Sequence, residues 1–406
     1  MKAYERLLKY VVVRTPSCDG EEEHPSSQCQ FDLARLLEKE MQELGLTDIC
    51  LDEHCYLYGK LPATPGCEDK TSIGFIAHMD TVSDYCDHEI VPVITENYDG
   101  RDLPLGDSGL TLSTDIFKHL PGLAGRTLIT SDGTTILVAD DKAGIAEILT
   151  LIERLQTENI PHGPISVAFT PDEEIGTGAS GFNVEQFGAK YGYTLDGDTE
   201  GEIQYENFNA CKARFDIQGF SVHPGSSKDT MINACLVAME INSLLPGMET
   251  PRGTEDYEGF FHLTDMSGDC AKAQLNYIVR DHDKNFFEAR KNTLRLIEKN
   301  LNAKWGEGTV TLTITEQYKN MAEIIDGCMH LIDNAKKAAE AAGIEPQVIP
   351  IRGGTDGCQL SFKGLPCPNL GTGGHAYHGP YEHITVEGMD KSVDMIVELV
   401  KIYAEM

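Results

Sequence analysis

The hydrophobic positions of this chain follow two different periods, and the change from one to the other outlines the expected elements. Apolar residues recur at helical spacing over residues 3–14 and 26–44, with Ser26 or Ser27 as an N-cap and Gly45 as a stop. Continuous apolar runs follow at 73–77 (IGFIA), 135–139 (TILVA), 165–169 (ISVAF) and 191–195 (YGYTL), with a helical pattern at 142–157. Apolar runs that alternate with helices predict a mostly parallel sheet covered on both faces, which is an α/β fold.

A different order of elements begins near residue 209. Over residues 209–316 the pattern indicates strand, helix, two strands, helix and strand, which is the βαββαβ order of a ferredoxin-like module. We therefore expect an inserted α+β domain at 209–316, with 1–208 and 317–406 as the two parts of the main domain. Helical patterns at 322–342 and near 387–405 return the chain to that main domain.

Length and charge narrow the possible functions. A chain of 406 residues exceeds the roughly 250–300 residues at which single cores stop growing. The balance of 33 Lys+Arg against 65 Asp+Glu gives a formal charge of −32, which repels nucleic acid and anionic membranes. We see no apolar run long enough for a membrane span and no signal-peptide cleavage site. The 12 cysteines contain no CxxC pair and fit reduced thiols, so we expect a soluble, cytoplasmic protein.

Each of the four apolar runs ends in histidine or acidic residues. They are followed, in chain order, by His78 and Asp80, by Asp140 and Asp141, by Asp172, Glu173 and Glu174, and by Asp196. A single acid after a strand is usually a turn or cap residue, but the carboxyl ends of parallel strands converge on one ligand-binding edge. Crowded carboxylates raise one another's pKa and need a compensating positive charge. Histidine nitrogen and carboxylate oxygen suit Zn²⁺, and Mn²⁺ or Co²⁺ accept similar ligands.

A second imidazole must come from elsewhere in the chain. The stretch GGHAYHGPYEH offers His375, His378 and His383, and spacing alone does not choose among them. With two imidazoles and three carboxylates, two ions about 3.5–4 Å apart could share a bridging carboxylate and a bridging water, which produces hydroxide at neutral pH. The long segment 84–134, rich in Gly, Asp and Thr, is expected to form a loop over this site.

The combination of these motifs resembles the M20 family of cocatalytic zinc peptidases. The similar segments are HMDTV, SDGTTILVADDKAGIAEI, FTPDEEIGTGA, YTLDGDTEGEIQYENFNA, VHPGSSKDTMINA, RDHD, RGGTDGCQLS and HGPYEH, which span residues 78 to 383. The resemblance implies two Zn²⁺ per subunit, with His78 and Asp196 on one ion, Glu174 and His378 on the other, and Asp140 as the bridge.

The resemblance also implies roles for residues that do not bind metal. Glu173 matches the general base, and Asp80 matches the residue that orients a ligating imidazole. Such a carboxylate can accept the second ring N–H of the histidine, and a base beside the metals can pass a proton from water to the leaving amine. In the inserted domain, His223 is expected to donate to the oxyanion and Arg280 to hold the substrate carboxylate. Arg352 is a further candidate for substrate contact.

Four more acids lie next to these positions. We expect Asp141 to shape the backbone or cap the following helix, and Asp172 to be a turn residue. Asp198 and Glu200 are more acidic than the family pattern at those positions. They bear on metal affinity and on the treatment of acidic substrates.

The function implied by the resemblance is a di-zinc aminopeptidase that removes the N-terminal residue of tripeptides through a metal-bridging hydroxide. The inserted domain would serve as a lid and as the surface of a homodimer. A dipeptidase, a carboxypeptidase or an N-acyl amino acid deacylase are alternatives within the same chemistry. A serine nucleophile has little support because the G-x-S-x-G elbow is lacking. A non-enzymatic metal- or peptide-binding scaffold is disfavoured because Glu173 is present.

Overall fold

The chain folds into two compact units, and the smaller one interrupts the larger. The computed structural model describes residues 1–21 and 23–406. The larger unit comprises Met1–Tyr205, Met321–Ile349 and Thr355–Met406, and the smaller one comprises Glu206–Asn320 and Pro350–Gly354. The segment expected as an insertion, 209–316, lies within the smaller unit, which also contains a short piece from much later in the chain.

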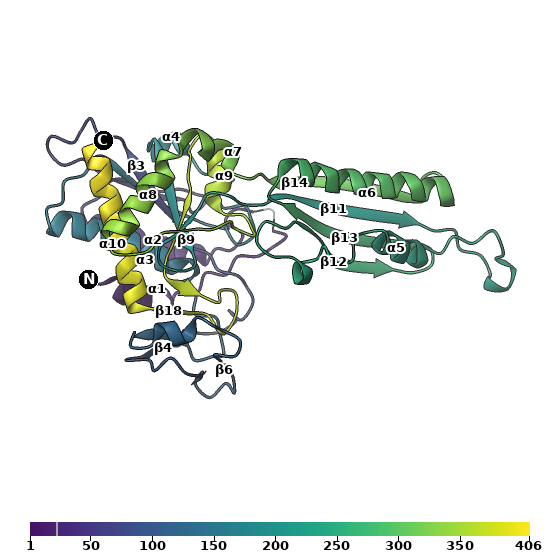
Figure 1. Cartoon of the computed structure of the whole chain (residues 1–406), viewed down its shortest axis with the longest axis horizontal. Coiled ribbons are helices and arrows are strands. Elements are labelled where there is room, and N and C mark those ends of the chain that lie inside the picture. The colour runs from purple at the N-terminus through teal and green to yellow at the C-terminus, as the bar shows by residue number, and fades with distance from the viewer. Residues whose placement is uncertain (22) are drawn as a thin grey trace. The chain divides into compact units, whose positions relative to one another are not determined.

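A mixed sheet of eight described strands forms the core of the larger unit, in the order β1-β2-β8-β3-β9-β16-β10-β15 (Figure 1). Its strands are β1 (Thr47–Leu51), β2 (Leu57–Leu61), β3 (Ile73–His78), β8 (Ile165–Thr170), β9 (Tyr191–Gly197), β10 (Glu202–Gln204), β15 (Gln347–Val348) and β16 (Asn369–Gly371). The central strands β8, β3, β9 and β16 are mutually parallel, whereas β2 and β10 run antiparallel to their central neighbours. The parallel part therefore brings several carboxyl strand ends to one edge.

Both faces of this sheet are covered. Phe75 of β3 stacks on Tyr193 of β9, whose hydroxyl is 2.9 Å from that of Tyr403 in the C-terminal helix. The next residue of β3, Ile76, belongs to a different hydrophobic cluster with Phe187 and Leu360. Successive side chains of a strand point to opposite faces, so the continuous apolar runs reflect burial on both sides.

The helices of the larger unit pack on the sheet and on one another. They are α1 (Ala3–Tyr10), α2 (Gln30–Glu43), α3 (Ala139–Thr157), α4 (Val184–Phe187), α7 (Ala322–Ile325), α8 (His330–Ala341), α9 (Asp356–Phe362) and α10 (Val386–Glu405). Helix α3 contacts β3 and β9, and α10 contacts both α3 and α8. No described helix is long and apolar enough to cross a bilayer, and all 12 cysteines are free thiols in the described residues.

One predicted strand is wrong. Residues 135–139 form no strand, and α3 already begins at Ala139. Leu137 and Val138 donate their backbone N–H groups to the Glu382 carboxylate, at 2.8 Å each, instead of to a neighbouring strand. Val138 has a φ of 60°, which is rare for a β-branched residue. A distant side chain thus holds this apolar run in a turn.

Three predicted helices are shorter or interrupted. The helix expected at 3–14 is α1, which ends at Tyr10. The helix expected at 26–44 begins at Gln30, and neither candidate cap is used: the Ser26 hydroxyl donates to the Asp172 carboxylate at 2.5 Å and the Ser27 hydroxyl to the Pro16 carbonyl oxygen at 2.6 Å. The helix expected at 322–342 is divided into α7 and α8 by a 3₁₀ turn at Asp326–Cys328.

Residues 84–134 form a small folded region and not an open loop. The region contains β4 (Pro92–Thr95), β5 (Leu103–Pro104), β6 (Thr111–Leu112), a 3₁₀ turn at Leu120–Leu123 and β7 (Leu128–Ser131). Strand β7 pairs with β4 and with β18 (His383–Thr385), and β18 pairs with β17 (Gly374–His375). This sheet therefore joins the region to the histidine-rich stretch near the C-terminus.

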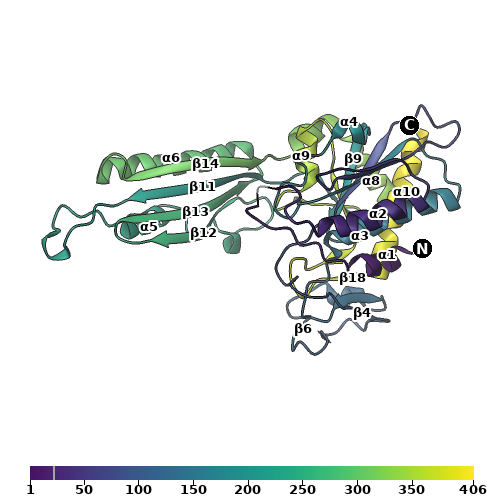
Figure 2. The same ribbon diagram turned by 180° about the vertical axis from the view of Figure 1, so that it is seen from behind.

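The smaller unit is the predicted βαββαβ module. Its elements are β11 (Asn209–Gln218), 3₁₀ turns at Pro224–Ser226 and Pro251–Gly253, α5 (Ala234–Ser243), β12 (Phe260–Gly268), β13 (Lys272–Asp281), α6 (Lys284–Trp305) and β14 (Val310–Tyr318). The antiparallel sheet has the order β12-β13-β11-β14, and Figure 2 shows it from behind. Residues of α5 and α6 share one hydrophobic cluster with β11 and β13. The predicted α/β fold with a ferredoxin-like module is confirmed.

Candidate metal centre

Asp140 lies at the centre of a group of histidines and carboxylates in the larger unit. Its Oδ1 is 3.0 Å from Nε2 of His78, and its Oδ2 is 3.0 Å from Nε2 of His378. Nε2 of His78 is also 3.4 Å from an Asp196 oxygen, and Nε2 of His378 is 3.2 Å from a Glu174 oxygen. The five residues predicted as ligands thus form two sets that share the Asp140 carboxylate.

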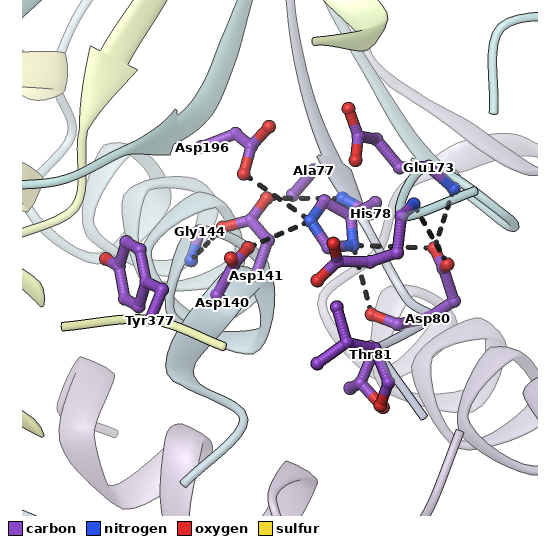
Figure 3. A network of polar contacts seen from close by, with 12 residues as sticks. Ala77, His78, Asp80, Thr81, Asp140, Asp141, Gly144, Glu173, Asp196 and Tyr377 are labelled. Atoms are coloured by element: carbon purple, nitrogen blue, oxygen red, sulfur yellow. Dashed lines mark hydrogen bonds and ion pairs between the residues drawn. The ribbon is translucent and has the colours of Figure 1, made fainter. Parts of the chain in front are cut away.

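The elements explain this convergence. His78 is the last residue of β3, and Asp196 lies near the end of β9, which is parallel to it. Glu174 follows β8, the parallel neighbour of β3 on the other side. Asp140 lies at the start of α3, where its backbone is not yet helical. Figure 3 shows Asp140, Asp141 and Asp196 on one side of the His78 ring and Asp80 on the other.

The donor set fits a divalent cation. Donor atoms within 4.8 Å of one another are found in the groups His78, Asp140, Glu174 and His78, Asp141, Asp196. Burial, opposed by the nearby imidazoles, raises the pKa of Glu174 to about 7 and that of Asp196 to about 6. Burial therefore disfavours the charged form of these carboxylates, and a cation among them would compensate. Imidazole nitrogen with carboxylate oxygen is a donor set that Zn²⁺, Mn²⁺ and Co²⁺ accept.

Asp141 has a structural task although it lies within reach of the donors. Its Oδ1 accepts the N–H of Gly144 at 3.1 Å, and its Oδ2 accepts the N–H of His78 at 3.2 Å. The first contact caps α3, and the second fixes the end of β3. Backbone amides thus contact both oxygens of Asp141, whereas the two oxygens of Asp140 each face an imidazole nitrogen.

Asp80 connects three parts of the centre. Its carboxylate accepts the backbone N–H groups of Glu173, at 2.9 Å, and Glu174, at 3.2 Å. Its backbone carbonyl oxygen is 3.0 Å from Nδ1 of His78, and its carboxylate is 3.4 Å from the same nitrogen. A carbonyl oxygen can only accept, so Nδ1 carries a proton, and Nε2 is the nitrogen that faces the carboxylates.

Glu173 differs from the residues around it in its hydrogen bonding. Its backbone N–H is held by Asp80, while its side chain belongs to neither donor group. Burial and the neighbouring Asp196 raise the pKa of Glu173 well above its usual value. A carboxylate in such surroundings binds a proton readily, as a general acid–base group must.

Sequence reasoning missed Glu382. This buried carboxylate accepts three backbone N–H groups, from Leu137 and Val138 at 2.8 Å and from Asp140 at 3.0 Å. It thereby fixes the turn that presents the Asp140 side chain. The available signal was its place in HGPYEH, four residues after His378, but its partners are amides that have no sequence signature.

Asp356 was also missed. It begins α9 and is 3% exposed, and its two carboxylate oxygens have no hydrogen-bond partner in the described residues. Burial raises the pKa of Asp356 to about 6. The signal was its position in the RGGTDG motif, but an acid after two glycines is equally typical of a turn.

Asp198 and Glu200, the two acids that make this chain more acidic than the family pattern, lie in different environments. Glu200 lies 2.6 Å from the Arg126 guanidinium and 3.5 Å from the Lys391 ammonium, so its charge is balanced. Burial and the neighbouring Glu202 raise the pKa of Asp198 to about 7. Asp172, expected to be a turn residue, makes long-range contacts, because its carboxylate accepts the N–H of Ser26 at 2.7 Å and lies 2.8 Å from Nδ1 of His24.

The three predicted substrate-binding residues lie in the smaller unit. His223 is exposed, and its Nδ1 accepts the N–H of Gly225 at 3.1 Å. Arg280 is 8% exposed and donates to the carbonyl oxygens of Cys211 and Val279. These contacts lie within the smaller unit, so the predicted roles of these residues in substrate binding stay predictions.

Arg352 has several partners in the same unit. Its guanidinium donates to the carbonyl oxygens of Asp256, at 2.7 Å, and Glu258, at 3.0 Å. It also lies over the Phe208 ring, with its central carbon 5.1 Å from the ring centroid. These contacts give Arg352 a structural task beside the predicted contact with substrate.

Comparison with known proteins extends over the whole chain. Residues 138–402 match Peptidase family M20/M25/M40. Peptidase T of Clostridium perfringens (strain 13 / Type A) is 51% identical over 405 residues, which cover 100% of this chain and 99% of that protein. Peptidase T of Alkaliphilus oremlandii (strain OhILAs) is 48% identical over 405 residues, with 99% of each chain covered.

A solved structure of an aminopeptidase is similar over nearly the whole chain. The crystal structure of aminopeptidase PepT from Bacillus cereus ATCC 10987 superimposes with a TM-score of 0.78 at 25% identity, covering 99% of this chain and 98% of that one. The family match includes Asp140, Glu173, Glu174, Asp196 and His378. The chain therefore belongs to peptidase family M20/M25/M40 and is a peptidase.

Proposed function

We propose that this peptidase is an aminopeptidase that releases the N-terminal residue of tripeptides. The observation that carries the proposal is the Asp140 carboxylate, which has an imidazole Nε2 at 3.0 Å from each of its two oxygens. Full-length relatives named Peptidase T support the substrate class, at 51% and 48% identity, and the related Bacillus cereus protein is named an aminopeptidase.

The centre would hold two Zn²⁺ per subunit, with Co²⁺ or Mn²⁺ as substitutes. His78 and Asp196 would bind one ion, Glu174 and His378 the other, and Asp140 both. When bound, the ions would polarise the scissile carbonyl and lower the pKa of the attacking water. The two donor sets that share Asp140 support this assignment.

Glu173 would move the proton of the reaction. Its carboxylate takes a proton from the attacking water and passes it to the nitrogen of the departing amine. Asp80 holds the backbone N–H of Glu173 at 2.9 Å and so keeps this base in place. Because Asp80 also orients His78, one residue would align the base and a ligand together.

The smaller unit would contribute to substrate binding. We assign His223 to the oxyanion, Arg280 to the C-terminal carboxylate of the substrate and Arg352 to a further substrate contact, with the unit itself acting as a lid and as the surface of a homodimer. A bidentate guanidinium contact would favour short peptides whose carboxylate lies at a fixed distance from the scissile bond. The 12 cysteines without a CxxC pair support a cytoplasmic location.

The test is a comparison of substrates with the purified full-length protein. We expect release of the N-terminal residue from tripeptides, its loss with a chelator, and its return on addition of Zn²⁺ or Co²⁺. Dipeptides and N-acetyl amino acids are assayed at the same concentration. Faster hydrolysis of either of them, or full tripeptidase activity in the chelated protein, would contradict the proposal.

A further inference from the structure

The loop after β8 carries both Glu173 and Glu174, and side chains from other parts of the larger unit hold its backbone. It runs over residues 172–181, with the sequence DEEIGTGASG, and contains no helix or strand. Asp80 holds its first part through the N–H groups of Glu173 and Glu174 (Figure 3). We call residues 172–181 the base loop. Its three glycines give the backbone more freedom than other residues would, so contacts from outside must fix its course.

A turn inside the base loop holds the carbonyl group of Glu173. The N–H of Gly176 donates to this carbonyl oxygen at 2.6 Å. Because Asp80 accepts the N–H of Glu173 at 2.9 Å, both polar groups of the Glu173 main chain have partners. The placement of the Glu173 side chain therefore depends on where Gly176 lies.

Gln359 of α9 holds Gly176. Its Nε2 donates to the carbonyl oxygen of Gly176 at 3.1 Å. Two hydrogen bonds in succession thus connect α9 to the main chain of Glu173, the first from Gln359 to Gly176 and the second from Gly176 to Glu173.

Lys363, the C-cap residue of α9, holds the later part of the base loop. Its ammonium group donates to the carbonyl oxygens of Ala179 and Ser180, the second at 2.7 Å. An ammonium group has three donors and no acceptor, so it can bind two neighbouring carbonyl oxygens together. These partners are 184 and 183 residues apart in the chain, so no local sequence pattern predicts the contacts.

Asp356, at the start of α9, packs against the same loop. A Cβ atom on Gly178 would lie 2.3 Å from Oδ1 of Asp356, so the close approach requires glycine. Residues 356, 359 and 363 are three and four positions apart, and this spacing places them on one side of a helix. One side of α9 therefore faces the base loop.

Tyr56 holds the far end of the base loop independently of α9. Its hydroxyl donates to the carbonyl oxygen of Gly178 at 2.8 Å and accepts the N–H of Gly181 at 2.9 Å. Tyr56 is fully buried. Loss of the contacts from α9 would therefore loosen the turn next to Glu173, while the end of the loop at Gly181 keeps its support.

We propose that Gln359 and Lys363 are positioning residues for Glu173. The inference rests on the role of Glu173 as the base in the function proposed above. A general base must lie within hydrogen-bond reach of the proton that it takes, and a displacement of about 1 Å can lower the rate by about 100-fold. In the described residues, no hydrogen bond or ion pair links Gln359 or Lys363 to a proposed metal ligand. Both side chains act on the reaction through the backbone of the base loop.

The experiment is a double-mutant cycle on the full-length protein with Zn²⁺ in excess. Gln359→Met and Lys363→Met remove the donors at similar side-chain length, and the clamp variant combines both changes. We expect kcat for tripeptides to fall by about 10–100-fold in the clamp variant, with KM little changed. In a Glu173→Gln background the same two changes should cause no further loss, because the base on which they act is absent. Lys363→Arg keeps a cationic donor and should retain the wild-type kcat.

Gln42→Met and Lys337→Met are the matched controls. Both side chains are exposed in other helices of the larger unit, so their replacement should leave kcat unchanged. An unchanged kcat in the clamp variant would overturn the proposal. An equal loss in the wild-type and Glu173→Gln backgrounds would overturn it as well, because the two side chains would then act independently of the base.

Hydrogen exchange separates this inference from the proposed function. The exchange of the amides of residues 173–181 does not depend on catalysis, and we expect it to be faster in the clamp variant than in the wild type. Equal exchange in the two proteins would overturn the proposal. Near-normal turnover of Glu173→Gln alone would instead refute the base role itself, and the exchange data would then show separately whether α9 holds the loop.

Discussion

At the scale of single residues, hydrogen bonds from backbone N–H groups to buried carboxylates position the residues of the candidate metal centre. Asp80 holds the amides of Glu173 and Glu174, and Glu382 holds that of Asp140. Each such carboxylate replaces a strand or helix partner that the local chain lacks. The proposed ligands Asp140 and Glu174 are therefore positioned through their main chain.

The Glu173→Gln variant tests the proposed base. The amide keeps the size of the side chain but cannot accept the proton, so we expect kcat for tripeptides to fall by about 10²–10⁴-fold while the metal content is unchanged. Metal analysis and steady-state kinetics measure the two effects separately. Glu185→Gln, which alters a glutamate in the first turn of α4, is the control. Near-normal turnover of Glu173→Gln would refute the role given to this residue.

The Glu382→Gln variant tests the support of the bridging ligand. Glutamine has one acceptor oxygen where the carboxylate uses two, so at least one amide loses its partner and Asp140 is held less firmly. We expect the affinity for metal to fall by about 10–100-fold, measured by competition with a chromogenic chelator. Glu405→Gln, at the exposed end of α10, should have wild-type affinity. An unchanged affinity in Glu382→Gln would show that the turn is stable without this carboxylate.

At the scale of elements, the sequence predicts those strands and helices that hydrophobic periodicity and local residue preferences determine. The runs at 73–77, 165–169 and 191–195 are strands, and the βαββαβ order of the smaller unit is correct. The run at 135–139 failed because four or five apolar residues cannot distinguish a strand from a buried turn. Its deciding partner, Glu382, lies 245 residues away from Leu137. Similarly, spacing alone in GGHAYHGPYEH does not choose among its three histidines, whereas the structure places Nε2 of His378 3.0 Å from Asp140.

Arg6 gives a prediction about the packing of helices. Only 2% exposed, it links three helices, because α1 carries it, Glu40 of α2 accepts at 2.7 Å and Thr150 of α3 accepts at 2.9 Å. Arg6→Met would leave the buried end of this network without its cation. We expect the free energy of unfolding to fall by about 3 kcal/mol, measured by urea denaturation. Arg35→Met, with a side chain that is 64% exposed, should change it by less than about 0.5 kcal/mol.

At the scale of the whole molecule, the net charge and two buried histidines change the stability of the fold in opposite directions as the pH falls. The formal charge of −32 at pH 7 disfavours the compact state through self-repulsion, and protonation of exposed carboxylates relieves this in mild acid. The buried histidines respond differently, because burial lowers the pKa of His375 and His383. Protonation of His375 and His383 therefore opposes this gain in stability as the pH falls.

The direction in which His383 changes the stability with pH can be tested. A histidine whose pKa is lowered by folding binds its proton more tightly when unfolded, so its contribution is complete above about pH 6.5 and decreases below it. For His383 the loss continues down to a pKa of about 4. We expect Tm to fall between pH 7.5 and pH 5 by less in His383→Phe than in the wild type. His88→Phe should follow the wild type, and equal losses in all three proteins would contradict the prediction.

The way the chain is divided also limits how it can be dissected. The polypeptide passes from one unit to the other after Tyr205, Asn320, Ile349 and Gly354. A fragment that ends at Asn320 lacks Arg352, whose guanidinium donates to Asp256 and Glu258. A chimaera that exchanges the smaller unit between homologues must therefore include both of its segments, Glu206–Asn320 and Pro350–Gly354. Exchange of the first segment alone would separate Arg352 from the Asp256 and Glu258 carbonyl groups of the same protein.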